Sequence, residues 1–260
     1  MKQIQINQTS IRAQDYNLVE KVGEDTNIFS PSLYKAIDLG LPSRTLWADR
    51  NIGAATPEDG GLYFQWGDTQ GYTAEQVGNG EGLKTFDWDD YKFSIDGSSS
   101  NFSKYNASDS KMVLDPEDDA ARVLMVGNWR MPTMENYKEL CLNTDIYLVP
   151  TEGEEIQGTV QEKSGNVTIH WESQAQKPFK GVKFYKKGDK QTYMFVPAAG
   201  GAYEGSMQNV AGCCFLWFSS LDSSHVWFAW GSYLQVSGGY IGRGFGRYYG
   251  VPVRGIMSNN

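Results

Sequence analysis

The chain has 260 residues, with 31 acidic against 23 basic side chains, a formal net charge of -8 and three cysteines. This length suits one large domain, or one domain with an appendage, and it can bury a sizeable core. The acidic balance excludes the basic surface that attracts phosphate backbones, so we expect no nucleic-acid partner. Three cysteines cannot make a disulfide framework, and no run is apolar enough to span a bilayer, so we expect no membrane insertion.

The first 35 residues are polar and weakly patterned. Residues 1–8 contain no apolar stretch and no cleavage site of the kind that a secretory signal needs, so we expect no export by an ordinary signal. We therefore divide the chain into an N-terminal arm for docking or oligomerisation, residues 1–35, and a binding domain, residues 36–260.

From residue 37 onward glycine and aromatic residues are dense, which is typical of short strands joined by tight turns. Residues 71–110 are rich in Gly, Ser, Asn and Asp, and they predict a long surface loop. Within that loop Asp87, Asp89 and Asp90 could supply oxygen ligands to Ca²⁺. We favour a solvated acidic loop instead, because the rest of a ligand set is missing, and we expect no metal and no cofactor.

Two helices are expected next. In residues 114–124, Asp115 is a natural N-cap, Pro116 fits the first helical position, and acidic side chains fill the first turn. In residues 132–141, Thr133 can cap a helix whose apolar residues recur at helical spacing.

The remainder of the chain predicts strand after strand. Val167, Ile169 and Trp171 alternate with polar residues, and further strands are expected around residues 182–184 and 193–196. Two helices followed by a strand-rich remainder predict an α+β domain.

The last 60 residues differ in kind from the rest, with five charged side chains, twelve aromatic residues and eleven glycines. Rigid aromatic residues among small polar ones are the composition of recognition surfaces, because Tyr and Trp give contact area at low entropic cost. The alternative is that the rings are core residues of strands, which we favour for Trp217, Trp227 and Trp230. We expect a ligand-binding face built from Asp222, Ser223, Ser224, His225, Tyr233, Tyr240, Arg243 and Phe245.

The sequence offers no strong catalytic candidate. Zinc-protease, Walker, CxxC and nucleophile-elbow motifs are absent. His170 lies on the polar face of its strand, and the Asp, Ser and His of residues 222–225 make no triad without spatial geometry. Cys213 and Cys214 have apolar neighbours, which predict buried and inert thiols. We therefore expect no catalytic residue and no enzymatic activity.

Several strings resemble a known family. They are IDLGLPSRTLWA at 37–48, YFQWGD at 63–68, LDPEDDAA at 114–121, GNWRMPT at 127–133, PAAG at 197–200, WFSS at 217–220 and RYYGVPVR at 247–254. In this order they resemble the Fibrobacter succinogenes major paralogous domain, over residues 37–256. The resemblance implies a C-type-lectin-like fold related to the formylglycine-generating enzymes, with two helices, short antiparallel strands and long loops. The Glu-Pro-Asn calcium motif of sugar-binding lectins and the catalytic cysteines of those enzymes are missing, which implies a binding member.

A narrower resemblance is to the variable proteins of diversity-generating retroelements, which display a hypervariable surface near the C-terminus. Mutated adenines in Asn codons of such proteins do not yield Lys, Glu or Met, and residues 219–249 contain none of the three. Trp227, Trp230 and Gln235 are exceptions that would belong to a fixed scaffold. A glycine- and aromatic-rich sheet also gives this pattern by chance.

These observations predict a non-enzymatic recognition protein of a Bacteroidetes phage, either receptor-binding or associated with the tail fibre. It would be made in the host cytoplasm and act in the virion. Its partners would be a host-cell surface receptor, protein or glycan, and other virion proteins bound through the arm, and the analogy to such phage proteins allows a homotrimer. Two alternatives remain open: a carbohydrate- or protein-binding module on the bacterial cell surface, and an oxidase of the formylglycine-generating type.

Overall fold

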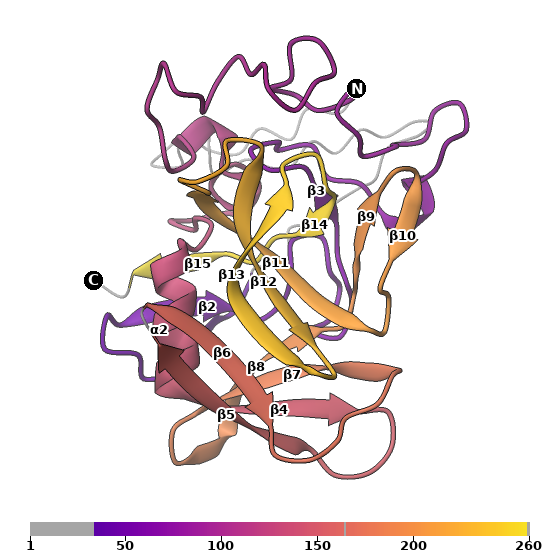
Figure 1. The fold of residues 1–260 in the computed structure, drawn as a ribbon. Coiled ribbons are helices and arrows are strands. Elements are labelled where there is room, and N and C mark those ends of the chain that lie inside the picture. The colour runs from indigo at the N-terminus through magenta and orange to yellow at the C-terminus, as the bar shows by residue number, and fades with distance from the viewer. Residues whose placement is uncertain (1–33, 164, 259–260) are drawn as a thin grey trace, which may run out of the picture.

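The structure, a computed structural model, describes residues 34–163 and 165–258 (Figure 1). Strand accounts for 41% of the described residues and helix for 9%. The expected α+β, C-type-lectin-like fold is therefore wrong: the protein has a β-rich fold built around one large curled antiparallel sheet. The expected helices are present but short, whereas segments that looked like glycine-rich turns extend the long strands of that sheet.

The sheet has eight strands and runs through most of the C-terminal half of the chain. Their order across the sheet is β11 (Cys213–Leu221), β12 (Phe228–Gln235), β13 (Gly238–Gly246), β6 (Asn166–Trp171), β5 (Ile156–Lys163), β4 (Thr144–Pro150), β7 (Phe179–Lys186) and β8 (Asp189–Pro197). The strands that the alternation predicted around residues 167–171, 182–184 and 193–196 are confirmed.

The sheet curls until its two outer strands meet. Just beyond β8, the amide of Gly200 donates to the carbonyl of Cys213 at 3.0 Å, and the amide of Ala211 donates to Ala198 at 2.7 Å. The curl places β11–β13 above β4, β5 and β7 in the view of Figure 1. Because backbone groups near the ends of β8 and β11 are paired with each other, part of each outer edge is satisfied within the fold.

Small sheets join the two ends of the described chain. β2 (Thr45–Ala48) lies between β1 (Ala36–Ile37) and β15 (Ile256–Ser258), and β3 (Tyr63–Phe64) pairs with β14 (Val251–Pro252). A separate hairpin consists of β9 (Gly201–Tyr203) and β10 (Ser206–Gln208). Residues 1–33 of the expected arm lie outside the described residues, but Tyr34 belongs to the domain, because its hydroxyl accepts a hydrogen bond from the amide of Gly53 at 3.1 Å.

The second expected helix is confirmed and the first begins later than expected. In α2 (Met134–Asn143) the Thr133 side chain caps the first turn by accepting from the amide of Asn136. Pro116–Asp118 forms only a 3-10 turn, and α1 (Ala120–Leu124) follows it. Asp119 stops the continuous helix, because its backbone is extended and its buried carboxylate accepts from the amides of Arg122 at 3.0 Å and Met131 at 2.8 Å. Within the described residues no helix is long and apolar enough to cross a membrane.

Strand β11 separates two hydrophobic cores. Cys214, Leu216 and Phe218 point into the core that α2 covers, whereas Phe215 and Trp217 point into a second core on the other face. A strand that is buried on both faces has a continuous apolar sequence, which is why this stretch shows no polar alternation.

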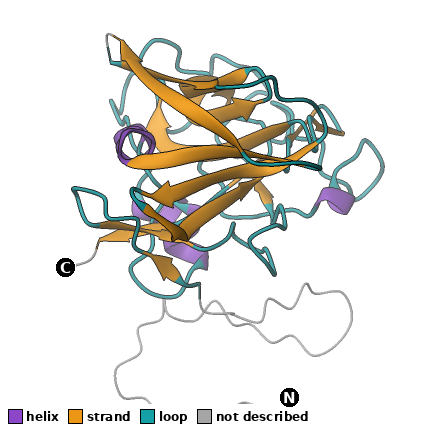
Figure 2. Ribbon diagram, turned by 90° about the horizontal axis from the view of Figure 1, so that it is seen from below, coloured by secondary structure: helices purple, strands orange, loops and turns teal. Residues whose placement is uncertain are grey.

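The second core is closed by the long loop that the sequence predicts. Between β3 and the 3-10 turn at Pro116 the only helical element is a further 3-10 turn, Ala74–Gln76, and Figure 2 shows the loops enclosing the strands. Aromatic side chains of this loop are buried against the sheet, among them Tyr91, Phe102 and Tyr105. The expected surface loop is therefore also a wall of the core.

Candidate ligand-binding site

The β12–β13 hairpin brings three of the predicted binding residues together. Tyr233 and Tyr240 are directly opposite each other in the ladder, and the guanidinium of Arg243 lies 4.4 Å from the ring centroid of Tyr233. Tyr240 and Arg243 are three positions apart, so strict alternation would put them on opposite faces. They share a face because the register shifts here, at a bulge where Gly242 has φ 81°.

Further tyrosines extend this surface beyond the hairpin. Phe245 is buried under it, with its ring centroid 6.3 Å from that of Tyr233 and 6.4 Å from that of Tyr249. The ring of Tyr249 stacks on that of Tyr203, with centroids 4.6 Å apart. We call the partly or fully exposed side chains of this surface the tyrosine–arginine face, and its members are Tyr203, Tyr233, Tyr240, Arg243 and Tyr249.

The one charged side chain of this face is Arg243. Among the described residues no carboxylate lies within ion-pair distance of Arg243. Burial raises the pKa of Tyr233 and of Tyr249 above the ordinary tyrosine value, and the opposing effect of Arg243 is smaller. Both phenols therefore keep their protons at neutral pH. The Tyr233 hydroxyl already donates to Gln235 Oε1 at 2.9 Å, so the other tyrosine hydroxyls, the ring faces and one guanidinium are what the face offers to a ligand.

The other predicted residues lie elsewhere. A Cβ at Gly244 would meet the Asp222 carboxylate at 3.2 Å and the Phe228 ring at 3.1 Å, on the face of β13 opposite Arg243. Asp222 is buried and accepts from the amide of Ser224 at 2.7 Å, whereas Ser223, Ser224 and His225 are exposed. The structure thus divides the eight predicted residues between two faces, with Phe245 in the core.

The tryptophans differ from the expectation in part. Trp217 is fully buried and its indole N–H donates to the carbonyl of Phe64 at 2.8 Å, as expected for a core residue. Trp227 is 38% exposed, and its ring centroid lies 5.2 Å from that of His225. It lies in the connection between β11 and β12, outside both strands.

Sequence reasoning missed Tyr203 and Tyr249. Tyr249 lies in the string RYYGVPVR, which was used only for the family resemblance. Tyr203 lies in a separate hairpin, and no local pattern shows that this hairpin is close to Tyr249. The available signal was the run of two tyrosines after Arg247, which is unusual for a segment that is wholly buried.

The structure gives no support to a catalytic triad at residues 222–225. His225 Nδ1 lies 3.6 Å from Asp222 Oδ2, but no serine hydroxyl of the described chain is hydrogen-bonded to the imidazole. His170 is exposed, and its Nε2 lies 3.3 Å from the Thr168 hydroxyl. Within the described residues neither histidine has both a hydroxyl and a carboxylate beside it, as a triad requires.

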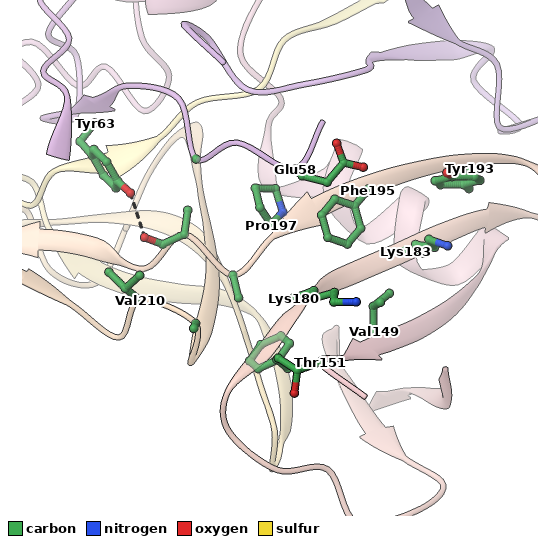
Figure 3. Close-up of a pocket in the computed structure, with 15 residues that line it drawn as sticks. Glu58, Tyr63, Val149, Thr151, Lys180, Lys183, Tyr193, Phe195, Pro197 and Val210 are labelled. Carbon is green, nitrogen blue, oxygen red and sulfur yellow. Dashed lines mark hydrogen bonds between the residues drawn. The ribbon is translucent and has the colours of Figure 1, made fainter. Parts of the chain in front are cut away.

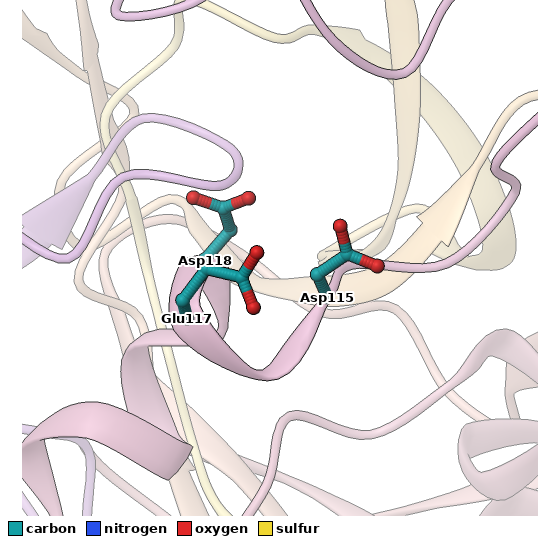
Figure 4. A group of neighbouring side chains, drawn as sticks. All are labelled: Asp115, Glu117 and Asp118. Carbon is teal, nitrogen blue, oxygen red and sulfur yellow. The ribbon is translucent and has the colours of Figure 1, made fainter. Parts of the chain in front are cut away.

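An acidic cluster lies at the start of the 3-10 turn before α1, and Figure 4 shows its members, Asp115, Glu117 and Asp118. The ammonium of Lys104 lies 2.7 Å from Asp115, 3.0 Å from Glu117 and 2.5 Å from Asp118. Lys111 pairs with Asp115 and Lys92 with Asp118, so three lysines of the chain already balance the three carboxylates. Burial opposes the charge of Asp118, yet hydrogen bonds from Lys104, Lys92 and Tyr105 outweigh it and lower the pKa of that carboxyl.

Asp90 of the long loop binds groups of the loop itself. The Asp90 carboxylate accepts from the amides of Phe86 and Asp87 at 3.0 and 3.1 Å and lies 3.2 Å from the Lys84 ammonium. Within the described chain Asp87, Asp89 and Asp90 do not form a group of converging ligands.

Alkylation of the folded protein tests the oxidase alternative. Burial raises the pKa of Cys213 to about 12 and raises the pKa of Cys141 and Cys214 well above the ordinary thiol value. Since only the thiolate reacts, and it forms only as the pH approaches these raised values, iodoacetamide at pH 8 should label none of the three. Mass spectrometry measures the labelling, and protein unfolded in guanidinium chloride, where all three should react, is the control. Rapid labelling of Cys213 or Cys214 in the folded protein would restore the oxidase as a candidate.

Comparison with known proteins adds no assignment: no family model, curated protein or solved structure matches the chain. The resemblance to the paralogous domain therefore stays a prediction, and function is argued from the residues.

Proposed function

We propose that the chain is a non-enzymatic recognition protein that binds its ligand on the tyrosine–arginine face. The observation that carries this proposal is the guanidinium of Arg243, held 4.4 Å over the Tyr233 ring without a carboxylate partner among the described residues. Arg and Tyr are the residue types that dominate binding energy at interfaces, because they combine a large contact area with directed hydrogen bonds.

The scaffold supports recognition by holding these side chains still. Tyr233, Tyr240 and Arg243 lie on paired strands, and Tyr203 and Tyr249 hold each other by ring stacking. A surface whose side chains are already ordered loses little conformational entropy when a ligand binds. Side chains on flexible loops would lose more conformational entropy, so this arrangement favours a selective binder.

For the ligand we propose a receptor on the surface of the host cell, protein or glycan, with the virion as the place where the protein acts. Support comes from the composition of the C-terminal segment and from the unpaired Arg243. Docking to other virion proteins is proposed for the N-terminal arm, whose residues 1–33 lie outside the described part of the chain.

Substituting the face should weaken cell binding without unfolding the protein. Tyr240→Ala and Arg243→Ala are each expected to reduce the affinity for receptor-bearing cells about tenfold, since truncating an interfacial anchor costs about 1–2 kcal/mol. Fluorescently labelled protein on a panel of Bacteroidetes strains, read by flow cytometry, measures the affinity.

The control is Ile95→Ala, which removes another exposed large side chain, from the long loop and outside the tyrosine–arginine face. It should leave cell binding unchanged. Binding to no strain of the panel, or equal binding by all three variants, would contradict the proposal.

A further inference from the structure

A cleft with a volume of about 710 Å³ opens over strands β7 and β8 (Figure 3). It lies on the outer face of these strands, because Met194 and Val196 point from β8 into the core beneath α2. Tyr193, Phe195 and Pro197 therefore form a row along the cleft floor, and the loop that carries Glu58 lies across from them.

The glycine at position 181 leaves room for the Phe195 ring on the cleft floor. A Cβ on Gly181 of β7 would lie 2.5 Å from the Phe195 ring and 2.3 Å from the Val196 carbonyl oxygen. Phe195 can therefore lie across the neighbouring strand, where it is buried, while Tyr193 at the open end is 40% exposed. An accessible aromatic ring next to a buried one offers a ligand an apolar platform with an open end.

Two lysines from β7 also line the cleft, and they differ in their partners. The Lys183 ammonium lies 2.6 Å from Glu155 Oε1 and 4.6 Å from the ring centroid of Tyr193. Burial opposes its charge, but hydrogen bonds to Glu155 and Tyr185 outweigh burial and raise the pKa of Lys183. Lys180 is exposed, and in the described parts of the chain no carboxylate lies within ion-pair distance of it. Lys180 is thus the one lysine of the cleft with a charge left for a ligand.

We propose that this cleft binds an anionic oligosaccharide, with a sugar ring packed on Tyr193 and its carboxylate or sulfate paired with Lys180. The C–H groups on one face of a pyranose are complementary to the electron-rich face of a tyrosine ring. Glu58 also lines the cleft, from the loop opposite, so we place the charged group of the sugar at Lys180 and sugar hydroxyl groups, which can donate to a carboxylate, toward Glu58. A nucleic acid would instead present a dense row of phosphates to a protein of net charge -8, which repels it.

This site is independent of the tyrosine–arginine face. Its lining residues come from β3, β4, β7, β8 and the loops beside them, whereas the proposed receptor-binding residues come from β9, β12, β13 and the segment after β13. The protein would therefore have two binding surfaces, and an experiment can contradict one of the two proposals without contradicting the other.

Isothermal titration with a galacturonic acid hexamer tests the proposal, with the fully methyl-esterified hexamer as the neutral comparison and a sulfated hexamer as the second anionic source. We expect the anionic hexamers to bind and the neutral one to bind about tenfold more weakly. Tyr193→Ala should weaken binding of the anionic hexamers about tenfold, and Lys180→Gln about fivefold, with the loss for Lys180→Gln vanishing on the neutral hexamer. Raising the salt concentration should reduce the affinity of the wild-type protein, because Lys180 is exposed.

Two matched variants complete the experiment. Lys190→Gln removes one positive charge from a lysine that lies 4.4 Å over the Tyr147 ring and does not line the cleft, and it should leave hexamer binding unchanged. Tyr240→Ala should also leave it unchanged while weakening cell binding. The proposal is overturned if no hexamer binds at millimolar concentration, if the neutral hexamer binds as well as the anionic ones, or if Tyr193→Ala and Lys180→Gln have no effect. Tighter binding of an acidic peptide or a single-stranded oligonucleotide through the same two residues would also overturn it.

Discussion

Replacing Arg247 by alanine is expected to lower the free energy of unfolding by about 4 kcal/mol. The side chain is fully buried, with its guanidinium 4.2 Å from the ring centroid of Phe102 and 5.2 Å from that of Trp66. It also donates a hydrogen bond to the carbonyl of Tyr105. Alanine would leave a cavity between the rings and a buried acceptor without a donor. Denaturation in urea, followed by tryptophan fluorescence, measures the change.

Arg243→Ala is the matched control for this prediction. It removes a guanidinium that is exposed, so the free energy of unfolding should change by no more than about 0.5 kcal/mol. Arg247→Met should be intermediate, because methionine refills part of the volume but gives no donor to Tyr105. A loss below about 1 kcal/mol for Arg247→Ala would show that Arg247 does not hold the long loop on the second core.

Gly231→Ala is expected to destabilise the protein by about 3 kcal/mol. A Cβ at this position would lie 2.8 Å from the Phe245 ring and 2.9 Å from the carbonyl oxygen of Leu216. The ring has no free space, because it packs between Phe215 and Trp217, and the carbonyl belongs to the backbone of β11 in its ladder with β12. The thermal midpoint and the urea midpoint should both fall.

The control for this substitution is Gly80→Ala, where the nearest atom to a new Cβ is 3.4 Å away and the backbone has no positive φ. That variant should be unchanged or slightly more stable, because alanine restricts the unfolded chain. Since Phe245 supports Tyr233, Gly231→Ala should also weaken cell binding. Equal stability of the Gly231 and Gly80 variants would show that the glycine is not required by packing.

Local signals predicted the local elements well. Thr133 identified the start of α2, and the alternation of Val167, Ile169 and Trp171 identified β6, because capping and side-chain periodicity depend only on neighbours in sequence. The fold class was wrong because it depends on which strands pair over long distances. Dense glycine predicted short strands and tight turns, whereas glycines in residues 231–246 lie in long strands and leave room for large side chains such as Phe245 and Leu234.

Only part of the candidate site could be predicted from the sequence. Tyr233, Tyr240 and Arg243 were named from residue type and do lie together, but Asp222 and Phe245 were named from the same composition and do not join them. The face of the sheet on which each side chain of β13 lies depends on the bulge at Gly242, where the alternation of side chains between the two faces is reversed. Glycine is compatible with such a bulge but does not predict one. The sequence alone therefore could not show which of the named residues lie on which face of the sheet.

The joining of the chain's early and late segments has a consequence for biosynthesis. The buried guanidinium of Arg254 donates to the Asn51 side chain, 203 positions earlier, and β2 and β3 pair with β15 and β14. At 5–20 residues per second, β2 and β3 wait roughly 10–40 s on the ribosome before their partners exist. During that time the apolar segment around Trp47 is without its native cover, so translation speed bears on how much nascent protein escapes aggregation.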